Sequence, residues 1–107
     1  MAKEQAVVIF VTTSSLAEAR KIGRALVEDK LVACANIIPQ IRSIYHWKEK
    51  IYDEPEALMV LKTRSGRIQK IIKKVQSLHS YTVPEIIAFP VVAGSKEYLG
   101  WIHKVTR

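Results

Sequence analysis

The sequence predicts an α+β fold in which a four-stranded antiparallel sheet carries two helices on one face. Two observations lead to this prediction. Apolar, β-branched runs typical of strands alternate with two segments in which apolar residues recur at helical spacing. Their order is strand, helix, strand, strand, helix, strand, with a short helix at the end, which is the order of a ferredoxin-like sandwich. The 107 residues fit one such domain, spanning residues 1–107.

The opening third of the chain predicts a strand followed by a helix. Residues 6–11 form an uninterrupted apolar run, which indicates a strand buried on both faces. Ser15 and Glu18 then match a capping box, in which a hydroxyl and a carboxylate accept hydrogen bonds from the first N–H groups of a helix. An amphipathic stripe continues from there, and we expect this helix to end near residues 29–30.

The middle of the chain predicts two further strands. The second strand occupies residues 31–38, and Pro39 interrupts its hydrogen-bond ladder, so a kink or an edge position is expected there. The strand resumes over residues 43–47 and turns at residues 48–50. The returning chain becomes the third strand over residues 57–63, which is again apolar on both faces.

The last third predicts a helix, a strand and a short terminal helix. Residues 65–79 carry apolar side chains at helical spacing. Residues 86–92 then read as a strand that is apolar on both faces, apart from Pro90. The terminal helix is expected over residues 96–105.

This pattern leaves one face of the sheet without a cover. Two helices can shield only one face, yet at least three strands are apolar on both. A monomer would expose more apolar surface than the few hundred Å² usual for monomeric proteins. The simplest cover is another copy of the chain, so we expect a homo-oligomer.

The net charge of +7 raises the possibility of a nucleic-acid partner. RNA-binding domains of this topology stack bases on aromatic residues of the first and third strands. Here the third strand has no aromatic residue, and the first strand offers only Phe10. The basic residues gather on helix flanks instead, so we interpret the charge as a solvated surface and expect no nucleic-acid partner.

Composition also bears on location. Residues 1–5 contain no apolar signal region, and the longest apolar runs are too short to span a bilayer. The single cysteine, Cys34, cannot form an internal disulfide. These features predict a cytosolic (cytoplasmic) protein with no membrane partner.

Signals for chemistry are weak when spacing alone is considered. No Ser–His–Asp pattern or paired-carboxylate signature stands out, which favours a non-enzymatic protein. Imidazole and thiolate suit copper and zinc, but no CxxC or HxxxH spacing occurs. A lone cysteine in an apolar strand is usually core, and a lone histidine at a helix end is usually a packing residue.

Five segments, taken together, resemble those of one known family. These segments are residues 31–39, 43–47, 61–63, 78–87 and 98–102. They resemble the CutA family, the divalent-cation tolerance proteins, over nearly the whole chain. The resemblance implies a homotrimer whose apolar sheet faces turn inward, a link to copper or other divalent cations, and no organic cofactor.

The sequence departs from the family pattern at positions that matter for metal and for turns. A copper site proposed in the family uses a cysteine and two adjacent histidines, and these positions correspond to Val11, Leu78 and His79, of which only His79 is retained. Glu49 stands where the family often has glycine, so a looser turn or another turn type is expected there. Ser80 stands where the family often has proline, which is expected to relax the chain after the second helix.

The leading hypothesis is a metal site at the clefts between subunits. His79 and Glu85 are its expected ligands or hydrogen-bond anchors, with Cys34, Lys62 and Tyr81 as further binding residues nearby. Copper or another divalent cation is the expected ligand.

The alternative is a trimeric signalling module of the PII type that binds a small anion between subunits. In that case Lys62 and Arg64 would meet a phosphate, although Lys62 also reads as a solvated strand end.

Overall fold

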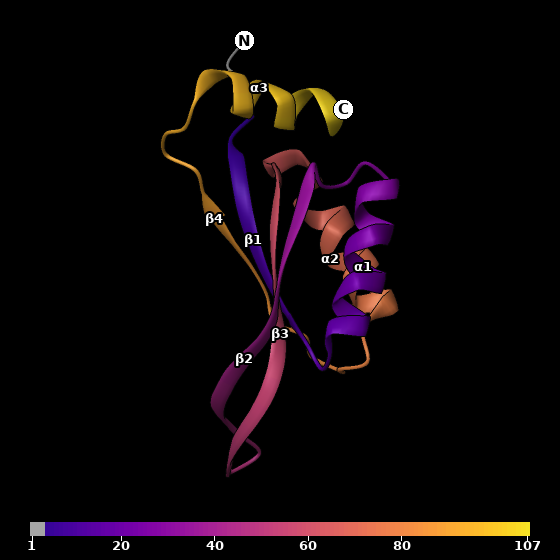
Figure 1. Cartoon of the computed structure of the whole chain (residues 1–107), viewed down its shortest axis with the longest axis vertical. Coiled ribbons are helices and arrows are strands. Elements are labelled where there is room, and N and C mark those ends of the chain that lie inside the picture. The colour runs from indigo at the N-terminus through magenta and orange to yellow at the C-terminus, as the bar shows by residue number, and fades with distance from the viewer. Residues whose placement is uncertain (1–3) are drawn as a thin grey trace.

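One antiparallel sheet with the strand order β2-β3-β1-β4 organises the computed structural model, which describes residues 4–107 (Figure 1). The strands are β1 (Ala6–Thr13), β2 (Cys34–Trp47), β3 (Lys50–Arg64) and β4 (Ile86–Pro90). The helices are α1 (Leu16–Glu28), α2 (Ile68–Leu78), which follows the 3-10 turn η1 (Ser65–Arg67), and α3 (Lys96–Val105). The ferredoxin-like order expected from the sequence is confirmed.

The hydrophobic core lies between the sheet and the pair α1 and α2, which cover the same face (Figure 1). Alternate residues of β1 and β3 point into it, as strand geometry requires. The fully buried members from these two strands and the two helices include Ile9, Val11, Met59, Leu61, Ile22, Leu26, Ile71 and Val75. Helix α1 packs closely on the sheet at Gly23, where an added Cβ would come within 3.3 Å of Ala35 Cβ and Met59 Cε.

Strand β2 begins and bends differently from the expectation. It starts at Cys34 instead of residue 31, because Leu31 and Val32 are buried in the turn that follows α1. The kink expected at Pro39 is confirmed: the register shifts between Ile38 and Ile41, so β2 holds one residue more than β3 there. Beyond this bulge β2 and β3 continue together as a long arm (Figure 1).

The arm ends in a two-residue turn at Lys48 and Glu49. Their φ angles are +48° and +65°, which is the left-handed pair of a type I′ hairpin. The expectation that the loss of glycine would change the turn type is therefore wrong. The tight turn is kept, and two non-glycine residues adopt the conformation that L side chains disfavour.

Replacing Glu49 by glycine should therefore stabilise the protein by about 1 kcal/mol, because the steric cost of the left-handed conformation disappears. Urea unfolding of the wild type and of Glu49→Gly measures the difference. Lys50→Gly is the matched control, since Lys50 lies in β3 and glycine in a strand should destabilise. A Glu49→Gly variant no more stable than the wild type would contradict this account of the turn.

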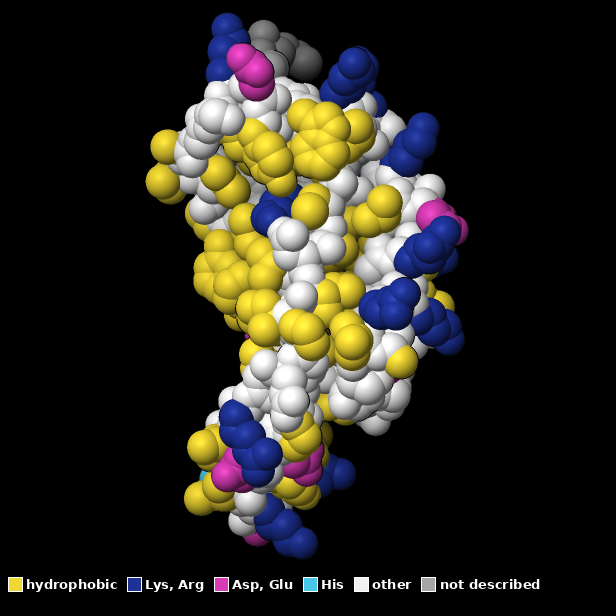
Figure 2. Space-filling view, viewed as in Figure 1, with side chains coloured by type: hydrophobic (Ala, Val, Ile, Leu, Met, Phe, Trp, Pro, Cys, Tyr) yellow, Lys and Arg dark blue, Asp and Glu magenta, His cyan; other side chains and the backbone are white. Residues whose placement is uncertain are grey.

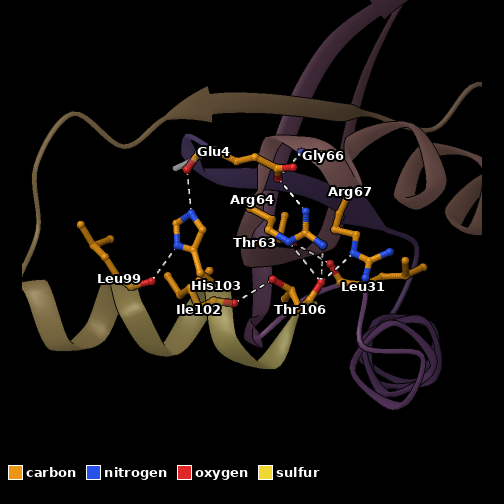
Figure 3. A network of polar contacts seen from close by, with 10 residues as sticks. All are labelled: Glu4, Leu31, Thr63, Arg64, Gly66, Arg67, Leu99, Ile102, His103 and Thr106. Carbon is orange, nitrogen blue, oxygen red and sulfur yellow. Dashed lines mark hydrogen bonds and ion pairs between the residues drawn. The ribbon is translucent and has the colours of Figure 1, made fainter. Parts of the chain in front are cut away.

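Helix α3 contacts β3 and β1 and is fixed by polar contacts at its C-terminal end (Figure 3). The guanidinium groups of Arg64 and Arg67 both donate to the carbonyl oxygen of Thr106, at 2.7 Å each for the closest nitrogen. Arg64 also forms an ion pair of 2.6 Å with Glu4. The ring nitrogens of His103 lie 2.6 Å from Glu4 O and 2.9 Å from Leu99 O. These groups serve the docking of α3.

The other face of the sheet, which we call the open face, is apolar and largely uncovered in the single chain. Its residues are Val8, Phe10, Ile38, Leu58, Val60, Ile87 and Phe89, which alternate with core residues along their strands. Ile38, Ile87 and Phe89 are 43–46% exposed. Figure 2 shows hydrophobic side chains gathered along the body of the sheet and beside α3. Strand β4 is thus exposed in the single chain, not buried on both faces.

Among residues 4–107, no helix is long and apolar enough to cross a bilayer.

Candidate functional site

A groove of about 750 Å³ lies where the base of the β2–β3 arm meets the end of β1 and the segment between α2 and β4. We call it the acidic groove. The lining residues that define it here are Thr12, Tyr45, Trp47, Glu56, Tyr81 and Glu85.

Glu56 is the most buried charged residue of the acidic groove. It is only 8% exposed, and its Oε2 accepts a hydrogen bond of 2.7 Å from the hydroxyl of Tyr81. Within residues 4–107, no Lys, Arg or His lies within ion-pairing distance of Glu56. A buried carboxylate without a counter-charge is costly, so the groove favours a cation from outside the chain.

Two groups that neighbour Glu56, Tyr81 and Glu85, have raised pKa values. Burial, together with the hydrogen bond to Glu56, raises the pKa of the Tyr81 hydroxyl, which therefore stays a donor. Glu85 lies at the exposed rim, and partial burial followed by the charge of Glu56 raises its pKa. Burial is the larger cause of both pKa shifts, and the negative charge of Glu56 adds to it.

His79 lies behind the groove with no exposed side-chain surface. Its Nε2 is 2.8 Å from the carbonyl oxygen of Thr12, and its Nδ1 accepts a hydrogen bond of 3.0 Å from the N–H of Tyr81. This assigns the proton of the neutral ring to Nε2. Both nitrogens are occupied, so within the chain His79 anchors Tyr81 and presents no free lone pair.

Glu18 of α1 accepts hydrogen bonds from Ser14 and from Ser80, which lies in the segment between α2 and β4. Its Oε1 accepts from Ser14 N and Ser14 Oγ at 3.0 and 2.9 Å, and its Oε2 accepts from Ser80 N at 2.7 Å. Burial alone would raise the pKa of Glu18, but these hydrogen bonds outweigh it and lower the pKa to about 2. The expectation that Ser80 relaxes the chain is wrong, because its N–H, which proline lacks, makes this bond.

The capping box is therefore confirmed in part. Ser15 Oγ accepts from Glu18 N at 3.1 Å, as expected. Oε1 of Glu18 accepts a hydrogen bond from the N–H of Ser14 and not from that of Ser15, and Oε2 accepts one from the N–H of Ser80.

The structure does not bring Cys34 and Lys62 to this groove. They are paired in register between β2 and β3, and both contact Asn36 Oδ1. Lys62 pairs with Val8 of β1, whereas His79 contacts Thr12. Four residues along a strand correspond to roughly 13 Å. His79, Tyr81 and Glu85 do lie together, at and behind the acidic groove. In the part of the chain that the structure describes, the charges of this groove without an ion-pair partner, on Glu56 and Glu85, are negative. They disfavour an anionic ligand in the groove, which the alternative hypothesis requires.

Sequence reasoning missed Glu56 and the aromatic residues Tyr45 and Trp47, and it gave Glu18 only a capping role, not the contact with Ser80. Glu56 reaches the groove because it lies in β3 opposite Ile41, on the face of the sheet away from the core residues Ala57 and Met59. No local spacing signals this. Among the described residues, no group of three or more His, Cys, Asp or Glu could hold a metal ion.

Comparison with known proteins settles the family. A family model described as "CutA1 divalent ion tolerance protein" matches residues 7–105. The chain belongs to the CutA1 family. Among CutA relatives, the divalent-cation tolerance protein CutA of Thermus thermophilus is 42% identical over 92% of this chain and 96% of its own length. Mouse protein CutA is 48% identical over 91% of this chain, which spans only 55% of the mouse protein.

Solved CutA structures have the same fold. CutA from Archaeoglobus fulgidus is 40% identical, with a TM-score of 0.93 over 95% of this chain and 99% of that one. The structure of the Thermus thermophilus protein gives a TM-score of 0.93 at 41% identity, over 95% and 99%. These proteins are named for tolerance to divalent cations and not for a reaction.

The prediction of a cytosolic location is wrong. The Archaeoglobus fulgidus structure is that of a periplasmic divalent cation tolerance protein CutA. The Arabidopsis thaliana relative, 38% identical, is a chloroplastic CutA. CutA relatives with similar sequences thus occur outside the cytosol, and the composition of the chain does not reveal the compartment.

Proposed function

We propose that this CutA1-family chain acts in divalent-cation tolerance as a non-enzymatic homotrimer that binds the cation at clefts between subunits. The observation that supports this most is the acidic groove, where buried Glu56 has no counter-charge and Glu85 at the rim has a raised pKa. A divalent cation between these carboxylates would neutralise both.

The donor set fits a cation that accepts oxygen ligands. Carboxylate oxygens suit Mg²⁺, Ca²⁺ and Mn²⁺, and they also bind Zn²⁺ and Cu²⁺. Copper held through His79 fits less well, because both ring nitrogens are occupied. We therefore assign Glu85 and Glu56 as ligands, His79 as the anchor of Tyr81, and Cys34 no part in this groove.

The groove of one chain supplies two carboxylates, fewer ligands than such cations need. Water or a second copy of the chain must complete the set, and this favours a cleft between subunits. The apolar open face gives an independent reason for assembly, since it leaves Ile38, Ile87 and Phe89 43–46% exposed, and contiguous exposed apolar patches mark interaction surfaces. Three copies are the arrangement that we propose.

Isothermal titration calorimetry with Mn²⁺, Zn²⁺ and Cu²⁺ tests the site. Glu85→Gln and Glu56→Gln should each weaken binding by about tenfold or more, because each removes a charged ligand. Glu97→Gln, on α3 outside the groove, is the control and should bind as the wild type does. Wild-type binding should also weaken as the pH falls through the raised pKa of Glu85, since the protonated carboxyl cannot ligate. If all three variants bind the cations equally well, the acidic groove is not the cation-binding site.

A further inference from the structure

The open face passes at the two ends of β3 into charged residues of opposite sign. Glu56 and Lys62 alternate along β3 with residues of the hydrophobic core, so both side chains lie on the open-face side of the sheet. Leu58 and Val60 lie between them on that side. The six residues from Glu56 to Lys62 correspond to roughly 20 Å along the strand. An apolar band therefore separates an acidic end of the open face from a basic end.

The acidic end consists of Glu56 and Glu85, which both line the acidic groove. Within residues 4–107, neither carboxylate lies within ion-pairing distance of a Lys, Arg or His. Glu56 accepts a hydrogen bond from the hydroxyl of Tyr81, but this group is neutral and does not cancel the charge. The acidic end thus keeps negative charge that the described part of the chain does not neutralise.

The basic end is Lys62, whose cross-strand neighbours are Val8 and Cys34. Its ammonium contacts the side-chain oxygen of Asn36, which is a neutral acceptor. No Asp or Glu among residues 4–107 lies within ion-pairing distance of it. In the single chain Lys62 is partly exposed, so water hydrates the ammonium. Beneath a second copy this water would be lost, and a buried ammonium without a counter-charge is strongly unfavourable.

We propose that copies of the chain associate head to tail across the open face, with the ammonium of Lys62 on one copy paired with Glu85 at the acidic end of the next. Contact between like ends would place Lys62 against Lys62 or Glu85 against Glu85, which is repulsive. Each copy carries one basic and one acidic end, so every charge finds a partner when the copies close into a ring. The inference rests on the assembly proposed above and not on metal binding, although a metal ion would compete with Lys62 for Glu85.

Glu85 is the carboxylate best placed to receive this ammonium. It directly precedes β4, whose residues Ile87 and Phe89 belong to the open face. Its side chain is exposed at the rim of the groove in the single chain, so a second copy can reach it. Burial, followed by the charge of Glu56, raises the pKa of Glu85, so the two carboxylates are close enough to interact. Both charges therefore attract the incoming ammonium.

A urea titration followed by sedimentation velocity in EDTA tests the pair, with the urea midpoint of dissociation as the readout. Lys62→Glu should shift this midpoint downward, by an amount equivalent to a loss of about 30-fold or more in the association constant. The variant removes the ammonium and places a further carboxylate against the acidic end. Adding Glu85→Lys to it reverses the sign of both partners and should recover about tenfold or more of that loss.

Lys70→Glu is the matched control, because Lys70 is an exposed lysine of α2, on the helical side of the sheet. It makes the same change of charge and should dissociate at the urea midpoint of the wild type. An unchanged midpoint in Lys62→Glu overturns the pairing while leaving the assembly in place, and so does a double variant that associates no better than Lys62→Glu alone. A wild type that is a single subunit without urea overturns the assembly and the pairing together. Because EDTA removes metal ions, failure of the metal site does not alter these outcomes.

Discussion

A Phe89→Glu variant is expected to lose its oligomeric state and to sediment as a single subunit or a smaller assembly at micromolar concentration. Phe89 lies on the open face, where its ring contacts Phe10 at 5.0 Å between centroids, and it is 43% exposed in the single chain. A glutamate there costs the isolated chain little, because it can reach solvent. In the assembly it would place an unpaired charge in an apolar interface, which is strongly unfavourable.

Leu16→Glu provides the control for this experiment. Leu16 is 41% exposed, nearly the same as Phe89, but it starts α1 on the helical side of the sheet. A negative charge in the first turn of a helix is also tolerated by the helix dipole. This variant should keep the mass of the wild type. If Phe89→Glu keeps that mass as well, the open face is not the surface through which the chains associate.

Glu18→Gln is expected to lower the free energy of unfolding at pH 7 by about 3 kcal/mol. The carboxylate has a pKa of about 2 in the folded protein against 4.5 for the ordinary group, and this difference is stabilising. An amide keeps only one acceptor oxygen, so it cannot receive hydrogen bonds from both Ser14 and Ser80. The segment that carries His79 and Tyr81 would lose its tie to α1.

The stabilisation by Glu18 depends on pH. Because the folded pKa of Glu18 is lowered, its stabilisation is present above pH 4.5 and is lost as the pH falls toward 2. Urea unfolding between pH 2 and 7 should show this loss in the wild type and a flatter profile in Glu18→Gln. Glu28→Gln is the control, since Glu28 forms only an exposed pair with Arg24 on the same helix and should change stability by less than about 0.5 kcal/mol. Parallel profiles for the wild type and Glu18→Gln would contradict the role given to Glu18.

The sequence predicted the fold because the fold depends on periodic patterns. The runs in β1 and β3 and the stripes of α1 and α2 repeat often enough to identify each element, and α3 was bounded at residues 96–105 as observed. Pro39 marked the bulge for a local reason, since proline cannot donate to the ladder. The errors at Leu31 and at Val92 lie at element ends, where periodicity is weakest.

The groove could not be predicted in the same way. Glu56 and Tyr81 are far apart in the chain, and their hydrogen bond exists only because β3 and the exit of α2 converge. His79 was singled out for its chemistry, yet its two ring nitrogens are used by Thr12 and Tyr81. At Glu49 the residue type itself led to the wrong expectation, because the two-residue hairpin imposes a positive φ that glutamate disfavours.

Sedimentation velocity of the wild-type protein at micromolar concentration tests the central claim most directly, namely that copies of this chain cover one another's open faces and form the clefts that hold the cation. The expected result is one species with three times the chain mass of 12.1 kDa. A folded species of 12.1 kDa would contradict it, because the apolar sheet would then be stable in water and no cleft between subunits would exist.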